Sequence, residues 1–276
     1  MTLPNQGLHD GINEREYHGD GYSLSSTSAK TLLYDGPRAY RWQKDNPPAY
    51  KAAFDFGSVV HALILGVGDT EVVDAAAWTG KEARVERERI RAEGKTPILR
   101  KDYLVALDMA EAVGANPVAS DLLSGGRAEV SAWAEDPETG VIMRGRFDYL
   151  RADSFSDVKT SAGKVDPREF SWTVRNFHYT FQAAWYQRLL SLNGYGDVPP
   201  FWVAVSKDPP HEVYVHRPSE DMLAAAHEDV DRALALYAEC KTRNEWPGLA
   251  DSHTIHTLTD TPWAYNYSEQ EEVIYG

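Results

Sequence analysis

The segment from Gly145 to Thr160 carries the residues whose types and spacing could do chemistry. Asp148 ends one apolar run, a short polar turn follows, and the triplet Asp157-Val158-Lys159 lies in the next run. Alternate residues of a strand share a face, so Asp157 and Lys159 point the same way while Val158 points into the core. If the two runs pair as neighbouring strands, Asp148 comes within reach of Asp157. Two carboxylates and an ammonium at one spot could bind a hard divalent cation and stabilise a phosphoryl group in transfer.

These charged residues also allow a plainer interpretation, in which they are solvated ends of strands. Asp-x-Lys triplets are common, so the triplet alone decides nothing. Here, however, Phe155 and Val158 flank the charged residues and an apolar strand precedes them, so the segment falls where a strand should be buried. Because buried charges must be paired or bind a metal, this setting favours a functional site.

Further residues could belong to the same site. His61 lies one helical turn after Gly57 on an apolar stretch, and the glycine could let the histidine approach whatever crosses that face. A histidine in such a place is more often a satisfied core residue. Glu129, on the preceding strand, could be a metal ligand or an outward-facing residue. Gln182 and Tyr186 are four apart and therefore share one face of a helix.

The elements that must position these residues follow from the periodicity of the chain. After residue 126 the pattern changes to period two, which predicts a three-strand meander with a hairpin turn at 136–140. We expect strands at 127–135, 141–150, 155–160, 201–206 and 213–215, and helices at 29–34, 37–42, 54–65, 81–95, 101–115, 167–177, 179–192 and 218–243. The fold class is therefore α/β (α+β), with a mixed sheet flanked by helices.

The organisation along the chain has three parts. Residues 1–22 are rich in Gly, Asn, Asp and His without a period, which predicts a flexible N-terminal arm. Residues 23–245 form a single domain with a helical N-terminal part and a core at about 127–216. Residues 246–276 form a C-terminal tail whose aromatic residues could pack on another surface.

Composition bounds the function. Of 276 residues, 42% are hydrophobic and 25% charged, as in ordinary globular proteins. Apolar runs are too short to span a membrane and the N-terminus has no signal-peptide pattern, so we expect a cytoplasmic protein without a membrane partner. Cys240 is the single cysteine, which excludes an internal disulfide or a four-cysteine cluster, and we expect it to be buried. The net charge of -14 disfavours nucleic-acid binding, although a local basic channel can exist on an acidic protein.

The motifs together are more specific than each one. Gly57-xxx-His61, Gly145-Arg-Phe-Asp148, Asp157-Val-Lys159 and Gln182-xxx-Tyr186, in this order, resemble the PD-(D/E)XK nuclease superfamily and, within it, the RecB-like and exonuclease VIII-like (RecE-type) branch. The stretch Leu24-Ser-Ser-Thr-Ser-Ala-Lys-Thr-Leu-Leu is also similar to the N-terminal region of the phage exonucleases. The resemblance covers about residues 17–240. One departure is that Phe147-Asp148 stands where the name-giving Pro-Asp pair is expected.

The resemblance implies a restriction-endonuclease-like core and a role for each motif residue. Asp148 and Asp157 are implied ligands of Mg²⁺ or Mn²⁺, together with the carbonyl of Val158. By the same resemblance, His61 completes or borders the metal site, and Glu129 is an additional acidic ligand ranked below the two aspartates. Lys159 orients the attacking water or offsets charge on the phosphate. Gln182 and Tyr186 hold the DNA strand or the geometry of the metal site.

The resemblance also implies an exonuclease that digests linear double-stranded DNA ends, 5′ to 3′, beside a single-strand annealing recombinase, with a ring-shaped homo-oligomer as one arrangement. A nuclease fold that binds DNA or a partner without catalysis, and an endonuclease, remain open. Basic and aromatic residues around the motifs could contact DNA or be solvated helix faces; they are Arg144, Arg146, Lys164, Arg168, Arg175, His178 and Tyr179. Trp172 and Phe177 could stack on an unpaired base, although core packing is the commoner use of such residues.

Overall fold

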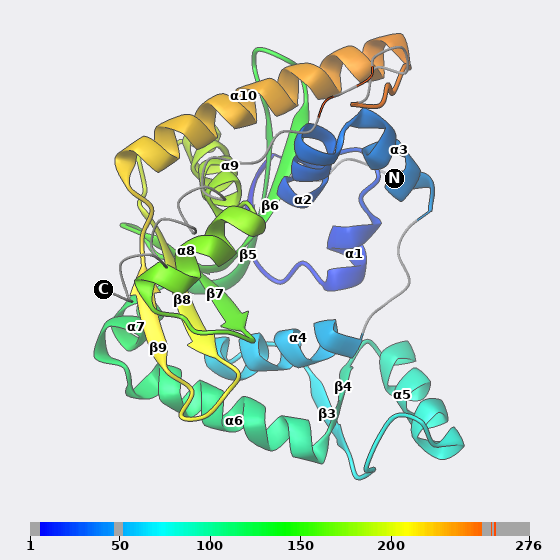
Figure 1. Cartoon of the computed structure of the whole chain (residues 1–276), viewed down its shortest axis with the longest axis vertical. Coiled ribbons are helices and arrows are strands. Elements are labelled where there is room, and N and C mark those ends of the chain that lie inside the picture. Colours follow the sequence, from blue (N-terminus) through cyan, green and yellow to red (C-terminus); the bar gives the residue numbers. More distant parts are fainter. Residues whose placement is uncertain (1–5, 47–51, 250–254, 256, 258–276) are drawn as a thin grey trace, which may run out of the picture.

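A seven-stranded mixed sheet forms the centre of the computed structural model, which describes residues 6–46, 52–249, 255 and 257 (Figure 1). The strands are β1 (Gly7–His9), β2 (Leu24–Ser25), β3 (Thr70–Val73), β4 (Thr96–Leu99), β5 (Arg127–Glu135), β6 (Ile142–Leu150), β7 (Phe155–Ser161), β8 (Pro200–Ser206) and β9 (Val213–His216). The helices are α1 (Glu14–Gly19), α2 (Ser26–Lys30), a π-helix (Thr31–Asp35), α3 (Pro37–Asp45), α4 (Ala52–Leu65), α5 (Lys81–Ala92), α6 (Arg100–Ala115), α7 (Pro117–Leu122), α8 (Pro167–Asn176), α9 (Tyr179–Leu192) and α10 (Glu220–Arg243). The predicted fold class is confirmed.

The sheet order places the strands of the two predicted aspartates side by side. The order is β1-β5-β6-β7-β8-β9, and the short β2 adds to β6 in parallel. The strands β5, β6 and β7 form the predicted antiparallel meander, β7 and β8 are parallel, and β9 returns antiparallel. Because β7 and β8 are parallel, the chain between them must cross over the sheet, and α8 and α9 form this connection. As a result β7, which carries Asp157 and Lys159, lies between two other strands.

Helices cover both faces of the sheet, as the alternation of side chains along β8 shows. Val203 and Val205 pack with residues of α4 and α6. Trp202 and Ala204, which point to the opposite face, pack with residues of α8 and α9. A third and larger cluster joins β5 and β6 to α9 and α10. The helix of His61 and the helix of Gln182 therefore approach the sheet from opposite faces.

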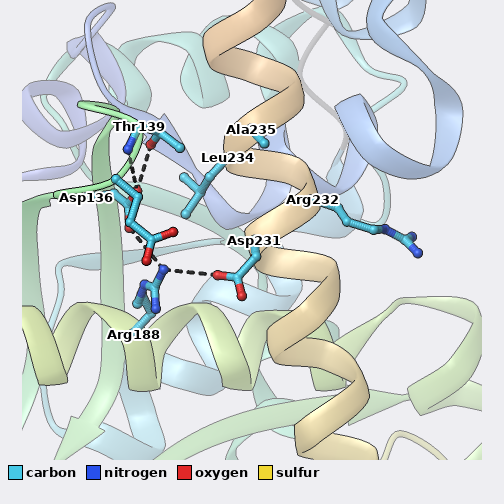
Figure 2. A pocket seen from close by; sticks show the side chains of 8 residues that line it. Asp136, Thr139, Arg188, Asp231, Arg232, Leu234 and Ala235 are labelled. Atoms are coloured by element: carbon cyan, nitrogen blue, oxygen red, sulfur yellow. Dashed lines mark hydrogen bonds and ion pairs between the residues drawn. The ribbon is translucent and has the colours of Figure 1, made fainter.

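The hairpin between β5 and β6 is fixed by a buried charge. The Asp136 carboxylate accepts hydrogen bonds from the backbone N–H and the hydroxyl of Thr139, which close the turn. Arg188 of α9 lies 3.1 Å from Asp136 and donates to Asp231 of α10 at 3.0 Å (Figure 2). These groups line a cavity of about 290 Å³. Because the Asp136 side chain is only 1% exposed, Arg188 is needed as its charge partner and ties the turn to both helices.

The N-terminal segment differs from the predicted flexible arm. β1 pairs antiparallel with β5, and α1 follows. Tyr17 is buried, and the guanidinium groups of Arg144 and Arg146 lie 5.2 and 4.3 Å from its ring centre. Asp20 accepts a hydrogen bond from Trp133 Nε1 at 2.9 Å. The prediction of an arm is wrong for residues 6–22, because contacts with strands more than 100 positions away hold them; residues 1–5 lie outside the described residues.

Most of the charged segment at 81–95 forms the exposed helix α5, as predicted. The side chain of Arg89 bridges Glu86, Glu93 and Glu71. The adjoining β3 and β4 form a separate parallel pair that was not predicted. Arg91 of α5 forms an ion pair of 2.7 Å with Asp55 of α4. This pair connects the small β3–β4–α5 unit to the helix that carries His61.

The predicted tail is described only at its start. Trp246 lies against the rings of Tyr40 and Tyr237, with centroid distances of 5.2 and 6.1 Å. The rest of the predicted tail, from residue 250 onward, lies outside the described residues apart from positions 255 and 257. Cys240 is buried, as expected. Over the described ranges, the helices lack the combination of length and apolar character that a membrane crossing requires.

Candidate active site

Strands β6 and β7 separate at the two aspartates. In the described strands they pair only next to the turn that joins them. The next pair in this register would join Asp148 to Asp157, and the ladder ends there. The Asp148 carboxylate instead accepts a hydrogen bond from the backbone N–H of Val158 at 2.7 Å. The predicted strand pairing is confirmed next to the turn, and the ladder opens where the two aspartates lie.

Lys159 is held between Asp157 and helix α9. Its ammonium forms an ion pair with Asp157 and donates a hydrogen bond to Gln182 Oε1 at 3.2 Å. It also lies 4.3 Å from the centre of the Tyr179 ring, a cation–π contact. Burial alone lowers the pKa of Lys159, but the carboxylates of Asp157 and Asp148 outweigh burial and raise its pKa above the usual value. The lysine is therefore a fixed positive charge at neutral pH.

Helix α9 brings the predicted Gln182 and Tyr186 to the same place. Gln182 Nε2 donates to Asp157 Oδ1 at 3.1 Å and to the Tyr186 hydroxyl at 3.3 Å. Burial raises the pKa of Tyr186, so its hydroxyl stays protonated. The approach of α9 to β6 depends on Gly145, because a Cβ there would lie 2.7 Å from Leu189 Cδ1 and 2.8 Å from Tyr186 Cε1. Glycine is therefore required at this position for the helix to reach the site.

Three potential metal ligands from three elements converge within the described part of the chain. His61 of α4, Glu129 of β5 and Asp148 of β6 each offer one ligand atom, and these atoms lie within 4.8 Å of one another. His61 Nδ1 is 3.4 Å from Asp148 Oδ2. Burial raises the pKa of Asp148 and the neighbouring Asp157 adds to the rise, while His61 and Lys159 oppose it. This set of carboxylate oxygens and one imidazole suits a divalent cation.

Glu129 has a backbone conformation that is unusual for its residue type. Its φ is 53°, in the left-handed region, and it interrupts the β5–β6 ladder opposite Asp148. Such strain costs about 1–3 kcal/mol and persists only where the surrounding structure imposes it. Burial and the charge of Asp148 raise the pKa of Glu129 to about 7. Glu129 was the lower-ranked ligand in the family resemblance, but the kink aims its carboxylate at Asp148 and His61.

The structure therefore divides the predicted site residues into two contacting groups. Glu129 and His61 lie with Asp148, whereas Asp157 faces Lys159 and Gln182. The amide of Val158 joins the two groups through its hydrogen bond to Asp148. The expectation for Gly57 is wrong, because an added Cβ there would meet no described atom within 4 Å.

Two of the predicted DNA-contacting residues are engaged inside the protein. Arg144 is buried, and its guanidinium donates to the backbone carbonyl of Asp20. Arg146 donates to the carbonyl of Ile12 at 2.7 Å and to Ser131 Oγ at 3.0 Å. Both guanidinium groups thus bind the N-terminal segment to the sheet. This placement speaks against the predicted DNA contacts of Arg144 and Arg146.

The other predicted contact residues remain open to a ligand. Lys164, Arg168 and Arg175 are exposed, and Tyr179 is half-buried over Lys159. His178 is half-buried and stacks on the Tyr34 ring. DNA binding by these residues stays a prediction.

Lys30 is a neighbour of the site that was not among the predicted residues. Lys30 ends α2, and its Nζ donates to the carbonyl of Phe177 at 3.0 Å. Burial lowers the pKa of Lys30 to about 8, the charge of Lys159 contributes to the decrease, and Asp157 opposes it. The similarity of the surrounding stretch to phage exonucleases was the one signal that could have indicated this residue.

The fold and the site together define a PD-(D/E)XK-like protein: a mixed sheet in which an acidic residue, an Asp-x-Lys triplet and a helical glutamine meet where two strands separate. The family model of the PDDEXK-like domain of unknown function (DUF3799) matches residues 37–258, so the chain belongs to this family. The resemblance to the PD-(D/E)XK superfamily is thereby confirmed.

Comparison with solved structures agrees on the fold. A crystal structure of a protein described as a putative exonuclease, from Eubacterium rectale, is similar with a TM-score of 0.59 and 15% identity, covering 100% of this chain and 99% of that one. The crystal structure of SSO0001 matches with a TM-score of 0.28 and 16% identity over 68% of this chain and 87% of that one, a similarity too low to support an argument. No curated protein matches the sequence.

Proposed function

We propose that the protein is a divalent-metal-dependent deoxyribonuclease that digests linear double-stranded DNA from its ends, 5′ to 3′, in phage-type recombination in the bacterial cytoplasm. The observation that carries the proposal is the convergence of Asp148, Asp157 and Lys159 where β6 and β7 separate. His61 and Gln182 reach this point from helices on opposite faces of the sheet. The similar fold of a protein described as a putative exonuclease supports action at DNA ends.

The donor set fits Mg²⁺ or Mn²⁺. Glu129, Asp148 and His61 would hold the cation, with Asp157 and the Val158 carbonyl as further oxygen donors. A second observation supports the fit: the ligand atoms of Glu129, Asp148 and His61 lie within 4.8 Å of one another, close enough to share one cation. When bound, such a cation lowers the pKa of a water ligand and offsets negative charge on the phosphate.

The protein's own groups supply the remaining electrostatics. The Lys159 ammonium, held by Asp157 and Gln182, offers its free N–H to a phosphate oxygen or to the attacking water. A positive charge already in place where negative charge develops stabilises the transition state without reorganisation. Gln182 fixes the direction of Lys159 through its carbonyl and of Asp157 through its amide. The protonated Tyr186 in turn accepts from the Gln182 amide, which orients the amide plane.

Two other functions use the same fold. A DNA-binding protein without catalysis is disfavoured because Asp148, Asp157 and Lys159 are intact and their contacts are formed. An endonuclease shares the site chemistry but does not need a DNA end. Covalently closed circular DNA separates these functions, because an endonuclease cuts it and an end-dependent exonuclease leaves it intact.

The experiment that tests the proposal compares the wild type with Lys159→Met on a linear duplex labelled at one end. We expect Mg²⁺-dependent release of the label from the 5′ end by the wild type and a loss of about 100-fold or more in the variant. Met keeps the length of the side chain, and circular dichroism checks that the variant is folded. Wild-type activity in the variant would remove Lys159 from the mechanism.

The partners follow from the family resemblance. An annealing recombinase would take up the single strand that the exonuclease exposes. A ring of several copies would surround a duplex with many weak phosphate contacts, which would help a chain of net charge -14 to hold DNA. Light scattering at several protein concentrations measures the mass and decides between a monomer and a ring.

A further inference from the structure

The junction between α8 and α9 presents an exposed aromatic side chain beside the active site. Phe177 is 59% exposed, so it does not have the core packing that is the commoner use of such residues. Its ring stacks on Tyr179, with centroids 5.6 Å apart and planes inclined by 18°. Tyr179 in turn lies over the Lys159 ammonium at 4.3 Å. A single side chain therefore separates the exposed ring from the lysine of the site.

The backbone at this junction is held in place by surrounding groups. His178 has φ 51° and ψ 46°, a left-handed conformation that is strained for this residue type. Its ring stacks on Tyr34 with centroids 3.7 Å apart and planes inclined by 9°. The carbonyl of Phe177 accepts a hydrogen bond from Lys30 Nζ at 3.0 Å. These contacts fix the junction, so the Phe177 ring stays directed outward.

The surroundings fit a nucleic-acid strand better than a hydrophobic peptide. The chain is acidic as a whole, yet Lys30, Lys159 and the exposed Arg175 lie around this junction. Beyond His178 a groove of about 490 Å³ runs between α8, α9 and α10, and the half-exposed Trp172 lines it. Aromatic faces next to positive charges are the combination that binds unpaired nucleotides, since the rings stack on bases and the cations contact phosphates.

We propose that Phe177 is a stacking platform for the base of a nucleotide that adjoins the scissile phosphate and is unpaired from its complement. The inference rests on the proposed nuclease function and adds that the site takes a locally single-stranded end rather than a closed base pair. Stacking on an aromatic ring is tolerant of base identity, which suits an enzyme that digests any sequence. The Tyr179 ring contacts both Phe177 and the Lys159 ammonium and so fixes the position of the platform relative to Lys159.

The test removes the ring from the protein and the base from the DNA, separately and together. The substrates are linear duplexes with a two-nucleotide unpaired end, either normal or with one abasic residue at successive positions. For one such position, Phe177→Ala and the abasic residue should each lower kcat/KM by about 5- to 150-fold, with little further loss when both are combined. Phe177→Trp should restore most of the rate. Val118→Ala, which trims an apolar side chain of similar exposure on α7, should change nothing.

The opposite results are equally distinct. If the abasic residue slows Phe177→Ala as much as it slows the wild type at every position, the ring does not contact a base and the inference is overturned. Full activity of Phe177→Ala on the normal substrate also overturns it. If the wild type digests no DNA with Mg²⁺, the proposed function fails, and the same four combinations are then compared by fluorescence anisotropy of the labelled oligonucleotides, which tests stacking without cleavage.

Discussion

Gly145 is the position at which one methyl group tests how closely helix α9 must lie on β6. In Gly145→Ala the new Cβ would lie 2.7 Å from Leu189 Cδ1 and 2.8 Å from Tyr186 Cε1, whereas carbon atoms in contact are separated by about 3.5–4.0 Å. Helix α9 would have to move outward by roughly 1 Å. Overpacking of this kind destabilises a protein by about 1–3 kcal/mol.

The same shift should reach the active site. The hydrogen bonds from Gln182 to Asp157 and from Lys159 to Gln182 measure 3.1 and 3.2 Å, so an added displacement of about 1 Å breaks them. A misplacement of that size in a catalytic group lowers activity by roughly 100-fold. We therefore expect Gly145→Ala to lose stability and activity together, although Gly145 itself contacts no substrate.

Gly57→Ala is the matched control for this change. It adds the same methyl group to helix α4, where no described atom lies within 4 Å, so it should raise the free energy of unfolding by about 0.5–1 kcal/mol. Urea unfolding followed by circular dichroism measures both variants, and release of nucleotides from linear duplex DNA measures activity. If Gly145→Ala unfolds at the wild-type urea midpoint and digests DNA at the wild-type rate, the close approach of α9 is not what positions Gln182.

Three other changes test separate parts of the structure. Glu129→Gly should raise the free energy of unfolding, measured in urea, by about 1 kcal/mol, because glycine tolerates φ 53°. The same variant should digest DNA more slowly in the presence of metal, and an unchanged rate of digestion would exclude Glu129 as a ligand. Arg188→Ala should lower the free energy of unfolding by about 3 kcal/mol in thermal unfolding, because Asp136 loses its charge partner. A decrease of less than ~0.5 kcal/mol, the usual effect of a neutral surface change, would contradict this role. Hydrogen bonds from Ser23 and Trp133 hold the pKa of Asp20 far below its usual value despite burial. The ionised Asp20 therefore stabilises the folded state fully above the pKa of about 3.9 that an Asp has in the unfolded chain, and this stabilisation is lost as the pH falls below that value. Asp20→Asn should therefore destabilise the protein at pH ~7 and by much less at pH ~2, and a difference independent of pH would refute the assignment.

The sequence predicted the elements whose causes are local. Long periodic segments such as α6, α9 and α10 lie within a few residues of their predicted bounds, and the β5–β6–β7 meander follows from alternation and a turn of two to five residues. The short strands β1 to β4 were not predicted. β1 pairs with β5 across more than 100 positions, and such pairing leaves no period in the sequence around it.

The site could be predicted where neighbouring strands or one helix face bring residues together. Asp148, Asp157 and Lys159 belong to adjacent strands of a meander, and Gln182 and Tyr186 share a helix face, so each of these two groups follows from period. The meeting of the two groups was implied by the family resemblance and not by period. The backbone kink at Glu129 has no such signal, because it arises from contacts across the sheet.

Side-chain direction was the least predictable feature. Arg144 and Arg146 were expected near DNA, but an N-terminal segment far away in the sequence covers them. For Trp172 and Phe177 the sequence left core packing and stacking on a base open, with core packing the commoner use, and both side chains are exposed. Apolar content alone does not show which face of a short helix meets the sheet, and in α8 that face belongs to Phe170 and Val174.

The central claim is that the group at Asp148 performs metal-dependent hydrolysis at DNA ends. The most direct measurement is the release of acid-soluble nucleotides from a linear duplex and from the same DNA as a closed circle, by the wild type and by Asp148→Ala, with Mg²⁺ and with a chelator. The proposed function predicts release in one case alone: wild type, linear DNA and Mg²⁺ together. Equal release by Asp148→Ala, or release from linear DNA with the chelator present, would contradict the claim.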